Sequence, residues 1–251
     1  GVFDLRLRKG NTEKREYTFQ AGFMGIDAAA EGPIRKGYNG SYLINYRYST
    51  LSLLGKIGVP LGDAITNFQD LSFNVYLPTE KAGNFTVFGF GGLSDQKVDA
   101  QRDSTKWVEV WNSYDQRFYA NTGAVGIKHF YLLNEKHYIQ SVLLASGNGQ
   151  GYTVDQLGDD YAKKRLYKEA FGNYKTTLST TWNWKMNSAM SLRTGMYLNH
   201  LGFSLNQQSF NFDTDQMHTD LDNKNTMQTA QFFSQMKYRM NDRLTLLYGV
   251  H

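Results

Sequence analysis

The stretch Tyr174–Leu198, YKTTLSTTWNWKMNSAMSLRTGMYL, alternates apolar and polar side chains. One face of its first arm carries Tyr174, Thr176, Leu178, Thr180, Trp182 and Trp184, and the other face carries Lys175, Thr177, Ser179, Thr181, Asn183 and Lys185. After a turn at Met186–Ser188 the alternation resumes, which predicts a β-hairpin with one apolar face. Each arm is about ten residues or a little more, long enough for a tilted strand to cross a bilayer. A long hairpin of a soluble sandwich would have the same pattern. Whether the pattern recurs along the chain distinguishes a membrane barrel from a sandwich.

The pattern does recur. Two strands are expected in Arg15–Ile34, and further strands at Ser41–Tyr48, Asp70–Leu77, Asn84–Leu93, Phe118–Leu132, His137–Ser146, Gln228–Met240 and Leu244–Val250. Short turns alternate with long connections, which are expected at Ser49–Gln69, Ser94–Arg117, Gly147–Asn173 and Leu201–Asn225. Such alternation is typical of outer-membrane barrels, with short turns at one end and long loops at the other. We therefore predict an all-β, antiparallel, up-and-down transmembrane β-barrel wall of about eleven strands.

Two details of this wall stay open in the sequence. Apolar residues fall on both sides of Asn84–Leu93 and of His137–Ser146, so the lipid and lumen faces of these strands are not assigned. Within the first long connection, Leu51–Ile57 could form a short helix.

Composition agrees with a strand-rich membrane protein. The 251 residues are 41% hydrophobic and 15% aromatic, with 24 Gly and only 3 Pro, which favours strands over helices. No apolar run is long enough for a transmembrane helix, but barrel strands give a much weaker hydropathy signal, so a mean hydropathy of −0.52 does not exclude a membrane. The chain has no Cys, and its formal net charge of +4 is spread without a concentrated patch. Disulfides, Cys nucleophiles and nucleic-acid partners are therefore not expected.

The first fifty residues resemble a known family. Gly1–Asn11, GVFDLRLRKGN, looks like the last strand of the plug domain in TonB-dependent outer-membrane receptors and transporters, and REYTFQAGFMGIDAAAEGPI resembles their first two barrel strands, which close on a Gly-Pro-apolar turn. The aromatic-rich texture is most similar to the Bacteroidetes branch. Barrels of this kind have about twenty-two strands, so the resemblance implies a fragment: residues 1–12 as the end of the plug and residues 13–251 as the first half of the barrel.

The resemblance also implies a function for the parent protein. It would be an active importer of a scarce nutrient in the bacterial outer membrane, energised by a periplasmic TonB-type partner, with a small-molecule, glycan or peptide substrate. A surface lipoprotein is a further candidate partner. No catalysis, cofactor or metal is expected. Two rival classes remain open: a passive porin or structural barrel, and a soluble β-rich adhesin or binding module.

Two sets of side chains are candidates for binding. Aromatic residues in the long connections could stack on flat ligands, or could pack the loops onto one another: Trp107, Trp111, Tyr114, Tyr152 and Tyr161. Polar residues opposite the apolar face are expected to face the lumen, where most would meet a plug or water: Lys175, Asn183, Lys185, Arg193, Gln231, Gln235, Lys237 and Arg239.

Three further motifs carry weaker signals. The GNGQG run at Gly147–Gly151 lacks the Gly-Lys-Ser/Thr ending of a phosphate loop and is expected to be a flexible loop tip. The carboxylates within FDTDQMHTDLDNKN could bind Ca²⁺, but their spacing does not match an EF-hand, so a solvated acidic loop is the main expectation. None of the five His lies in a catalytic motif.

Overall fold

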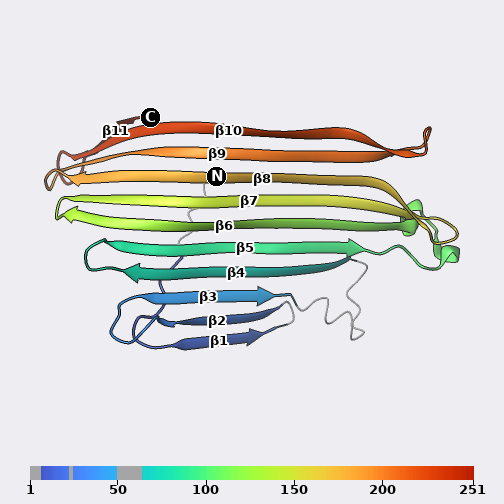
Figure 1. The fold of residues 1–251 in the computed structure, drawn as a ribbon, viewed down its shortest axis with the longest axis horizontal. Helices are drawn as coiled ribbons and strands as arrows, with labels where there is room; N and C mark the ends of the chain where they lie inside the picture. The colour runs from blue at the N-terminus through green and yellow to red at the C-terminus, as the bar shows by residue number, and fades with distance from the viewer. Residues whose placement is uncertain (1–6, 23–24, 50–63) are drawn as a thin grey trace.

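The computed structural model describes residues 7–22, 25–49 and 64–251. This part of the chain forms eleven strands and two short 3₁₀ helices (Figure 1): β1 Glu16–Ala21, β2 Ile26–Pro33, β3 Ser41–Tyr48, β4 Ala64–Pro78, β5 Asn84–Val98, η1 Ser104–Lys106, η2 Val110–Ser113, β6 Tyr114–Asn134, β7 His137–Leu157, β8 Lys163–Lys185, β9 Met190–Asn211, β10 Gln216–Arg239 and β11 Thr245–Val250. Neither of the described helices is long and apolar enough to cross a membrane.

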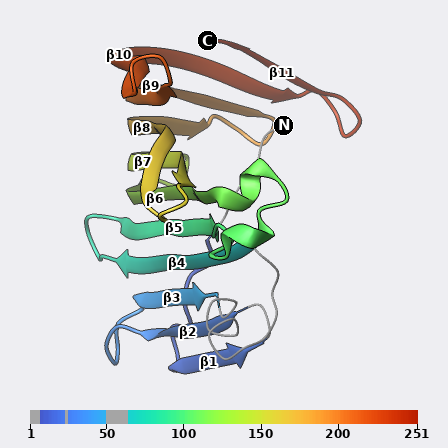
Figure 2. The same ribbon diagram turned by 90° about the vertical axis from the view of Figure 1, so that its right-hand side faces the viewer.

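All eleven strands lie in one sheet whose order is the order of the sequence, β1 to β11. Every neighbouring pair is antiparallel, so the sheet is a single up-and-down meander. Figure 2 shows the strands stacked in this order as one layer. The predicted all-β, antiparallel, up-and-down architecture is confirmed.

The sheet has almost no enclosed core. Among the described residues only two apolar side chains, Ala100 and Leu157, are fully buried. A single layer exposes both of its surfaces, so its side chains form two faces rather than an interior. The fold is therefore held chiefly by backbone pairing between neighbouring strands and by side-chain contacts along each face.

Several hairpin turns are closed by hydrogen bonds to the side-chain oxygen of an asparagine. In the turn between β8 and β9, the Asn187 side-chain oxygen accepts hydrogen bonds from the amides of Ala189 and Met190, both at 2.8 Å. Asparagine oxygens accept two backbone amides in the same way at three other turns, at Asn134, Asn211 and Asn241. An Asx turn of this kind fixes the turn locally, which sets the register of the strands that follow.

Two of the four expected long loops, Gly147–Asn173 and Leu201–Asn225, are wrong over most of their length. β7 continues through the glycine run at residues 147–151, which is mid-strand and not a loop tip, and the next connection spans only residues 158–162. β9 and β10 likewise extend through the stretch at 201–225, leaving a turn at 212–215. Most residues of these stretches are polar, which weakens the apolar alternation that sequence analysis uses, yet the antiparallel ladders continue through them.

Two other expectations have different outcomes. The connection at residues 99–113 is long, as predicted, and carries both 3₁₀ helices. The short helix that Leu51–Ile57 could form lies outside the described residues, as do residues 1–6 of the segment that resembles a plug strand. Residues 7–11 of that segment are not in a strand.

Candidate functional site

Strand register sorts the side chains into two faces. Residues that pair directly across an antiparallel ladder lie on the same face. The pairs Ile127↔Leu143, Leu143↔Leu178 and Leu178↔Leu198 therefore join four strands along one surface, which we call the apolar face. The other surface is the polar face.

The register also assigns the two strands that the sequence left open. In β5, Val87 pairs with Ile127 and so lies on the apolar face, whereas Phe88 and Phe90 lie on the polar face. In β7, Leu143 lies on the apolar face, and Tyr138, Val142 and Leu144 lie on the polar face.

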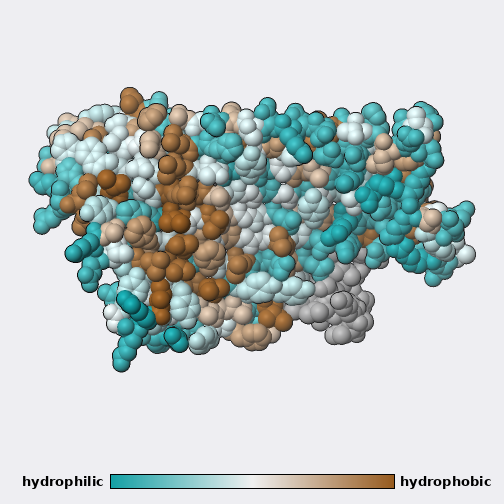
Figure 3. Space-filling view, in the orientation of Figure 1, coloured by the Kyte–Doolittle hydropathy of each residue, from teal (hydrophilic) through white to brown (hydrophobic). Residues whose placement is uncertain are grey.

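The apolar face carries a continuous apolar belt across the sheet, visible as the brown band in Figure 3. Its side chains are large and exposed, with 50% of Leu143 and 66% of Phe232 accessible. Soluble monomers rarely expose an apolar surface of this extent, so the belt needs a covering medium. The belt consists of Phe19, Ile44, Tyr46, Leu71, Val125, Ile127, Leu143, Leu178, Leu198 and Phe232.

Aromatic rings gather on the same face near the short turns. His137, Trp182 and Trp184 stack on one another, with ring centroids 5.4 to 5.8 Å apart. Two strands further along the sheet, Phe85 stacks on His129 at 4.4 Å. Rings with an apolar body and a polar edge are the residues that favour a membrane–water boundary.

On the side toward the other strand ends, the belt reaches a glycine row. Gly91 pairs with Gly123, and Gly123 pairs with Gly147. Gly147 pairs with Tyr174, which pairs with Gly202. A Cβ at Gly202 would collide with the ring of Tyr174, so this ring lies against the glycine backbone.

Beyond the glycine row the same face becomes charged. Lys97 pairs with Arg117, and Asp115 with Asp155. β8 has 23 residues, which at the rise of a strand is roughly 75 Å, more than twice what a bilayer core requires even with tilt. The outer halves of the longest strands project past the belt. Their side chains on the belt's face are mostly polar, whereas the opposite face there includes Leu201 and Phe203.

The register places all eight residues expected to face a lumen on the polar face. Lys185 pairs with Ser191, which pairs with Lys237. Asn183 pairs with Arg193, which pairs with Gln235. Lys175, Gln231 and Arg239 lie at even spacings from these residues on the same strands, and therefore on the same face.

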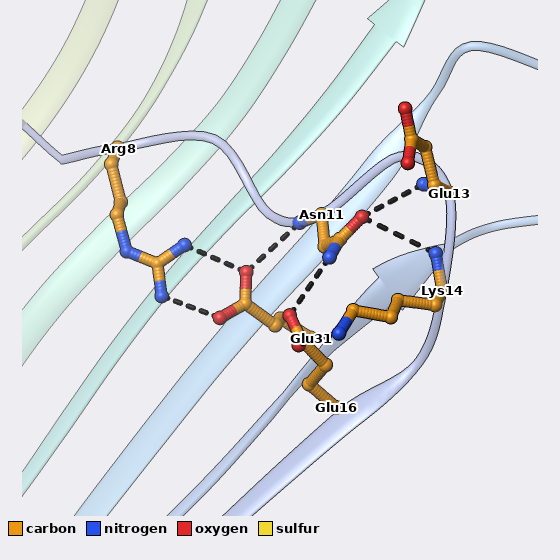
Figure 4. A network of polar contacts seen from close by, with 6 residues as sticks. All are labelled: Arg8, Asn11, Glu13, Lys14, Glu16 and Glu31. Atoms are coloured by element: carbon orange, nitrogen blue, oxygen red, sulfur yellow. Dashed lines mark hydrogen bonds and ion pairs between the residues drawn. The ribbon is translucent and has the colours of Figure 1, made fainter.

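On β1 to β4 the polar face is covered by the chain itself. Residues 7–12 precede β1 and lie against this face (Figure 4). The Arg8 guanidinium forms a two-pronged ion pair with Glu31, at 2.6 and 2.5 Å, and the Asn11 amide also donates to Glu31, at 2.9 Å. The Leu7 carbonyl accepts from Asn74 at 3.3 Å, and the Lys9 ammonium sits 3.3 Å from the centre of the Tyr76 ring.

Farther along the polar face, two adjacent rows line a hollow of about 600 Å³. It combines apolar side chains with amides, hydroxyls and one cation, Lys175. Such a mixture suits an amphipathic ligand, because apolar surface supplies contact area and a few polar groups fix orientation. The lining includes Phe90, Thr122, Asn148, Asn173, Lys175, Leu201, Phe203, Asn225 and Met227.

The five candidate loop aromatics do not form one cluster. Trp107 and Tyr161 meet edge to face at 6.4 Å, and the Trp107 indole donates to the Gln101 carbonyl at 2.7 Å, so this pair packs two connections together. Trp111 lies in η2 and is 61% exposed. Tyr114 opens β6, next to η2.

Tyr152 belongs to a separate group on the projecting part of the polar face. Its hydroxyl donates to Gln116 at 2.5 Å, and its ring lies 6.1 Å from that of Tyr167. The Tyr167 hydroxyl donates to Glu169 at 2.7 Å, which raises the pKa of Tyr167 to about 12. Sequence reasoning missed Tyr167 and Glu169, because both fall in a stretch expected to be loop.

A buried carboxylate anchors the long connection at 99–113. Asp115, whose side chain is 11% exposed, accepts the Ala100 amide at 2.8 Å and pairs with Arg102 at 2.9 Å and Lys163 at 2.6 Å. Burial acts to raise the pKa of Asp115, but hydrogen bonds from Lys163, Ala100 and Arg102 outweigh it and leave the pKa lowered. No sequence motif marks this residue.

The acidic stretch beyond β9 is mostly strand. Asp213 and Asp215 lie in the turn before β10, whereas Asp220 and Asp222 lie on β10, where Asp220 accepts a hydrogen bond from Ser209 at 3.0 Å. Across the described residues, no three His, Cys, Asp or Glu side chains are grouped as a metal site would require.

Taken together, the register and the two faces define the class of structure: a one-layer, up-and-down β-wall with opposite apolar and polar surfaces. No family model matches the sequence, and no curated protein matches it. Among solved structures, the chain is similar to the crystal structure of the ferric yersiniabactin uptake receptor FyuA from Yersinia pestis, with a TM-score of 0.47 and 8% identity over 91% of this chain. The match covers 39% of the length of that receptor chain.

Proposed function

We propose that this chain is the wall of an outer-membrane β-barrel of the TonB-dependent receptor class, which imports a scarce nutrient. The proposal rests on one observation: successive strands form a sheet with an apolar face on one side and a polar face on the other. One face has an exposed apolar belt with aromatic rings near the short turns, and the other face is polar. A bilayer on one side and an aqueous or protein-filled lumen on the other would satisfy both surfaces.

Within this proposal, residues 1–12 are the end of a plug and residues 13–251 are the first half of the barrel. Support for the division comes from residues 7–12, which lie on the polar face and bind it through Arg8 and Asn11 rather than joining the sheet. The eight polar-face residues predicted from the sequence then face the lumen. Outside the cell, substrate would bind near the projecting strand ends, and a periplasmic TonB-type partner would supply the energy.

Among the candidate substrate contacts, we assign the leading roles to Trp111 and Tyr152. Trp111 is exposed, and Tyr152 lies on the polar face beside the Tyr167–Glu169 pair. Tyr114 would line the entrance next to Trp111. Trp107 and Tyr161 would hold the loops in place, because their rings already contact each other. No cofactor or covalent chemistry is needed for this role.

The proposal can be tested by cysteine labelling, since the chain has no Cys of its own. Leu178→Cys and Ser179→Cys are matched neighbours on opposite faces of β8. In lipid vesicles, we expect a water-soluble maleimide to label position 179 and to spare position 178 by about tenfold or more. In detergent-free buffer the chain should not stay soluble and monomeric.

The outcomes separate the rivals. Equal labelling of both positions in a soluble, cooperative monomer would support a binding module and contradict the wall. If labelling alternates, ion conductance through the full-length protein separates importer from porin. A plugged importer should be closed at rest, whereas steady conductance would indicate a passive pore.

A further inference from the structure

Four cations gather on the polar face of β8, β9 and β10, near the short turns. Lys185 and Lys237 flank Ser191 in one row, Arg193 lies one row above them, and Arg239 lies one row below. All four are exposed. We call these residues the cationic patch.

Within the described part of the chain, the patch has no acidic partner. None of its four side chains forms an ion pair with another described residue. Arg193 lies over the Phe233 ring at 5.7 Å, and Arg239 donates to the Ser188 carbonyl at 3.4 Å. Four like charges on three neighbouring strands repel one another, so an anionic occupant would stabilise this surface.

The patch also surrounds a space that an occupant could enter. A hollow of about 430 Å³ is lined by all four cations together with amides such as Asn183 and Gln235. Lysine and arginine supply charged donors here, and the amides can donate and accept. The lining is therefore suited to an acidic polypeptide, whose carboxylates can pair with the cations and whose backbone can pair with the amides.

The geometry favours an extended chain over a single small anion. Adjacent rows on a face lie about 7 Å apart, and Lys185 and Lys237 are two strand spacings, or about 10 Å, apart. One phosphate could not reach three rows, whereas an extended polypeptide with carboxylates at alternate positions repeats at the same spacing of about 7 Å. Lipid headgroups are disfavoured for the same reason, because each phosphate group reaches only one row, although Trp184 of the opposite face also borders the hollow.

The same face already provides an example of such a contact. On β2 a carboxylate of the sheet, Glu31, binds a cation brought by the covering segment, Arg8. On β8 to β10 the signs are reversed, since the sheet supplies the cations. We propose that the cationic patch docks an acidic polypeptide segment, whose carboxylates pair with Lys185, Arg193, Lys237 and Arg239. This inference depends on the register and the charges, and does not require the chain to be a transporter.

The test uses the 251-residue chain in non-ionic detergent, with its strand content checked by circular dichroism. Two labelled peptides are compared by fluorescence anisotropy: one in which glutamate alternates with serine, and one in which glutamine replaces glutamate. We expect the glutamate peptide to bind and the glutamine peptide not to bind. Binding should also weaken with added salt.

Paired variants then locate the site. The double variant Arg193→Gln with Lys237→Gln should weaken binding of the glutamate peptide about tenfold. The control, Lys168→Gln with Lys224→Gln, makes the same change in net charge on the opposite face and should leave binding within about twofold. Lys237→Glu with Arg239→Glu should transfer preference to a peptide in which lysine alternates with serine.

Three results would overturn the proposal. If the two double glutamine variants weakened binding of the glutamate peptide equally, the peptide would bind outside the cationic patch. Binding of the glutamine peptide as tightly as the glutamate peptide would remove the role of charge. Displacement of the glutamate peptide by equimolar pyrophosphate would identify a phosphate site instead.

Discussion

Asp115 shows how one side chain can hold a whole connection in place. Its carboxylate receives an amide from residue 100 and charges from Arg102 and Lys163, so it ties the loop that carries Trp107 and Trp111 to two strands. Charged hydrogen bonds of this kind contribute roughly 1–3 kcal/mol to the closed arrangement.

Acid should release this connection. The pKa of Asp115 is lowered in the folded state, so its contribution is fully present above the unfolded value of about 3.9, and is lost as pH falls through the lower folded value. A fluorophore at Val108→Cys, a site that is 87% exposed, should show a fall in anisotropy below about pH 4.

Two variants check the assignment of that acid transition. Asp115→Asn should give low anisotropy at every pH, with no transition. The pKa of Asp103 is also lowered, by hydrogen bonds from Thr105 and Lys106, so Asp103→Asn serves as the control and should keep the transition. A transition that survives Asp115→Asn would contradict the anchoring role.

Within the strands, the hairpin that carries Trp182 and Trp184 gives the most direct test of the proposed membrane placement. Trp182 and Trp184 stack on the apolar face close to the turn at residues 186–189, whereas Trp107 and Trp111 lie in the projecting connection. The two pairs are all the tryptophan in the chain, so each can be observed separately.

Brominated lipids should distinguish the two pairs. With Trp107→Phe and Trp111→Phe, the remaining hairpin fluorescence should be quenched most by bromines near the headgroups, by about twofold or more over bromines at the midplane. The reciprocal protein, Trp182→Phe with Trp184→Phe, should show little quenching by either lipid. Equal quenching of both proteins would place the apolar face outside a bilayer.

Sequence alone predicted the strands that bear the belt, because an apolar surface imposes a visible period of two. It did not predict the projecting halves of β7 to β10, where most residues are polar and the short alternation of Leu201, Phe203 and Leu205 lies on the polar face. The site was predicted in part for the same reason. The face of Lys175 and its companions follows from periodicity, but the Asp115 anchor joins residues that are distant in sequence, and only the paired strands bring them together.

At the scale of the whole molecule, the sheet has two open edges. β1 and β11 each pair with one neighbour and carry no further strand within the described residues. β11 is short and exposed along its whole length. An exposed edge presents unpaired backbone groups that recruit another strand.

The isolated chain should therefore associate through its edges even in detergent. Light scattering should show concentration-dependent assembly, and Leu246→Lys with Tyr248→Lys on the edge strand should shift its midpoint to about tenfold higher concentration. The control places two lysines on a strand away from the edge, as Leu178→Lys with Thr180→Lys. A chain that stays monomeric at all concentrations would contradict this prediction.

The glycine row has a mechanical consequence for the wall. Along the line from Gly91 to Gly202, four of the five positions have no Cβ atom, and Tyr174 supplies the one side chain. Backbone without Cβ atoms bends at low steric cost. We therefore expect the sheet to bend most easily along this row, between its apolar belt and its projecting strands.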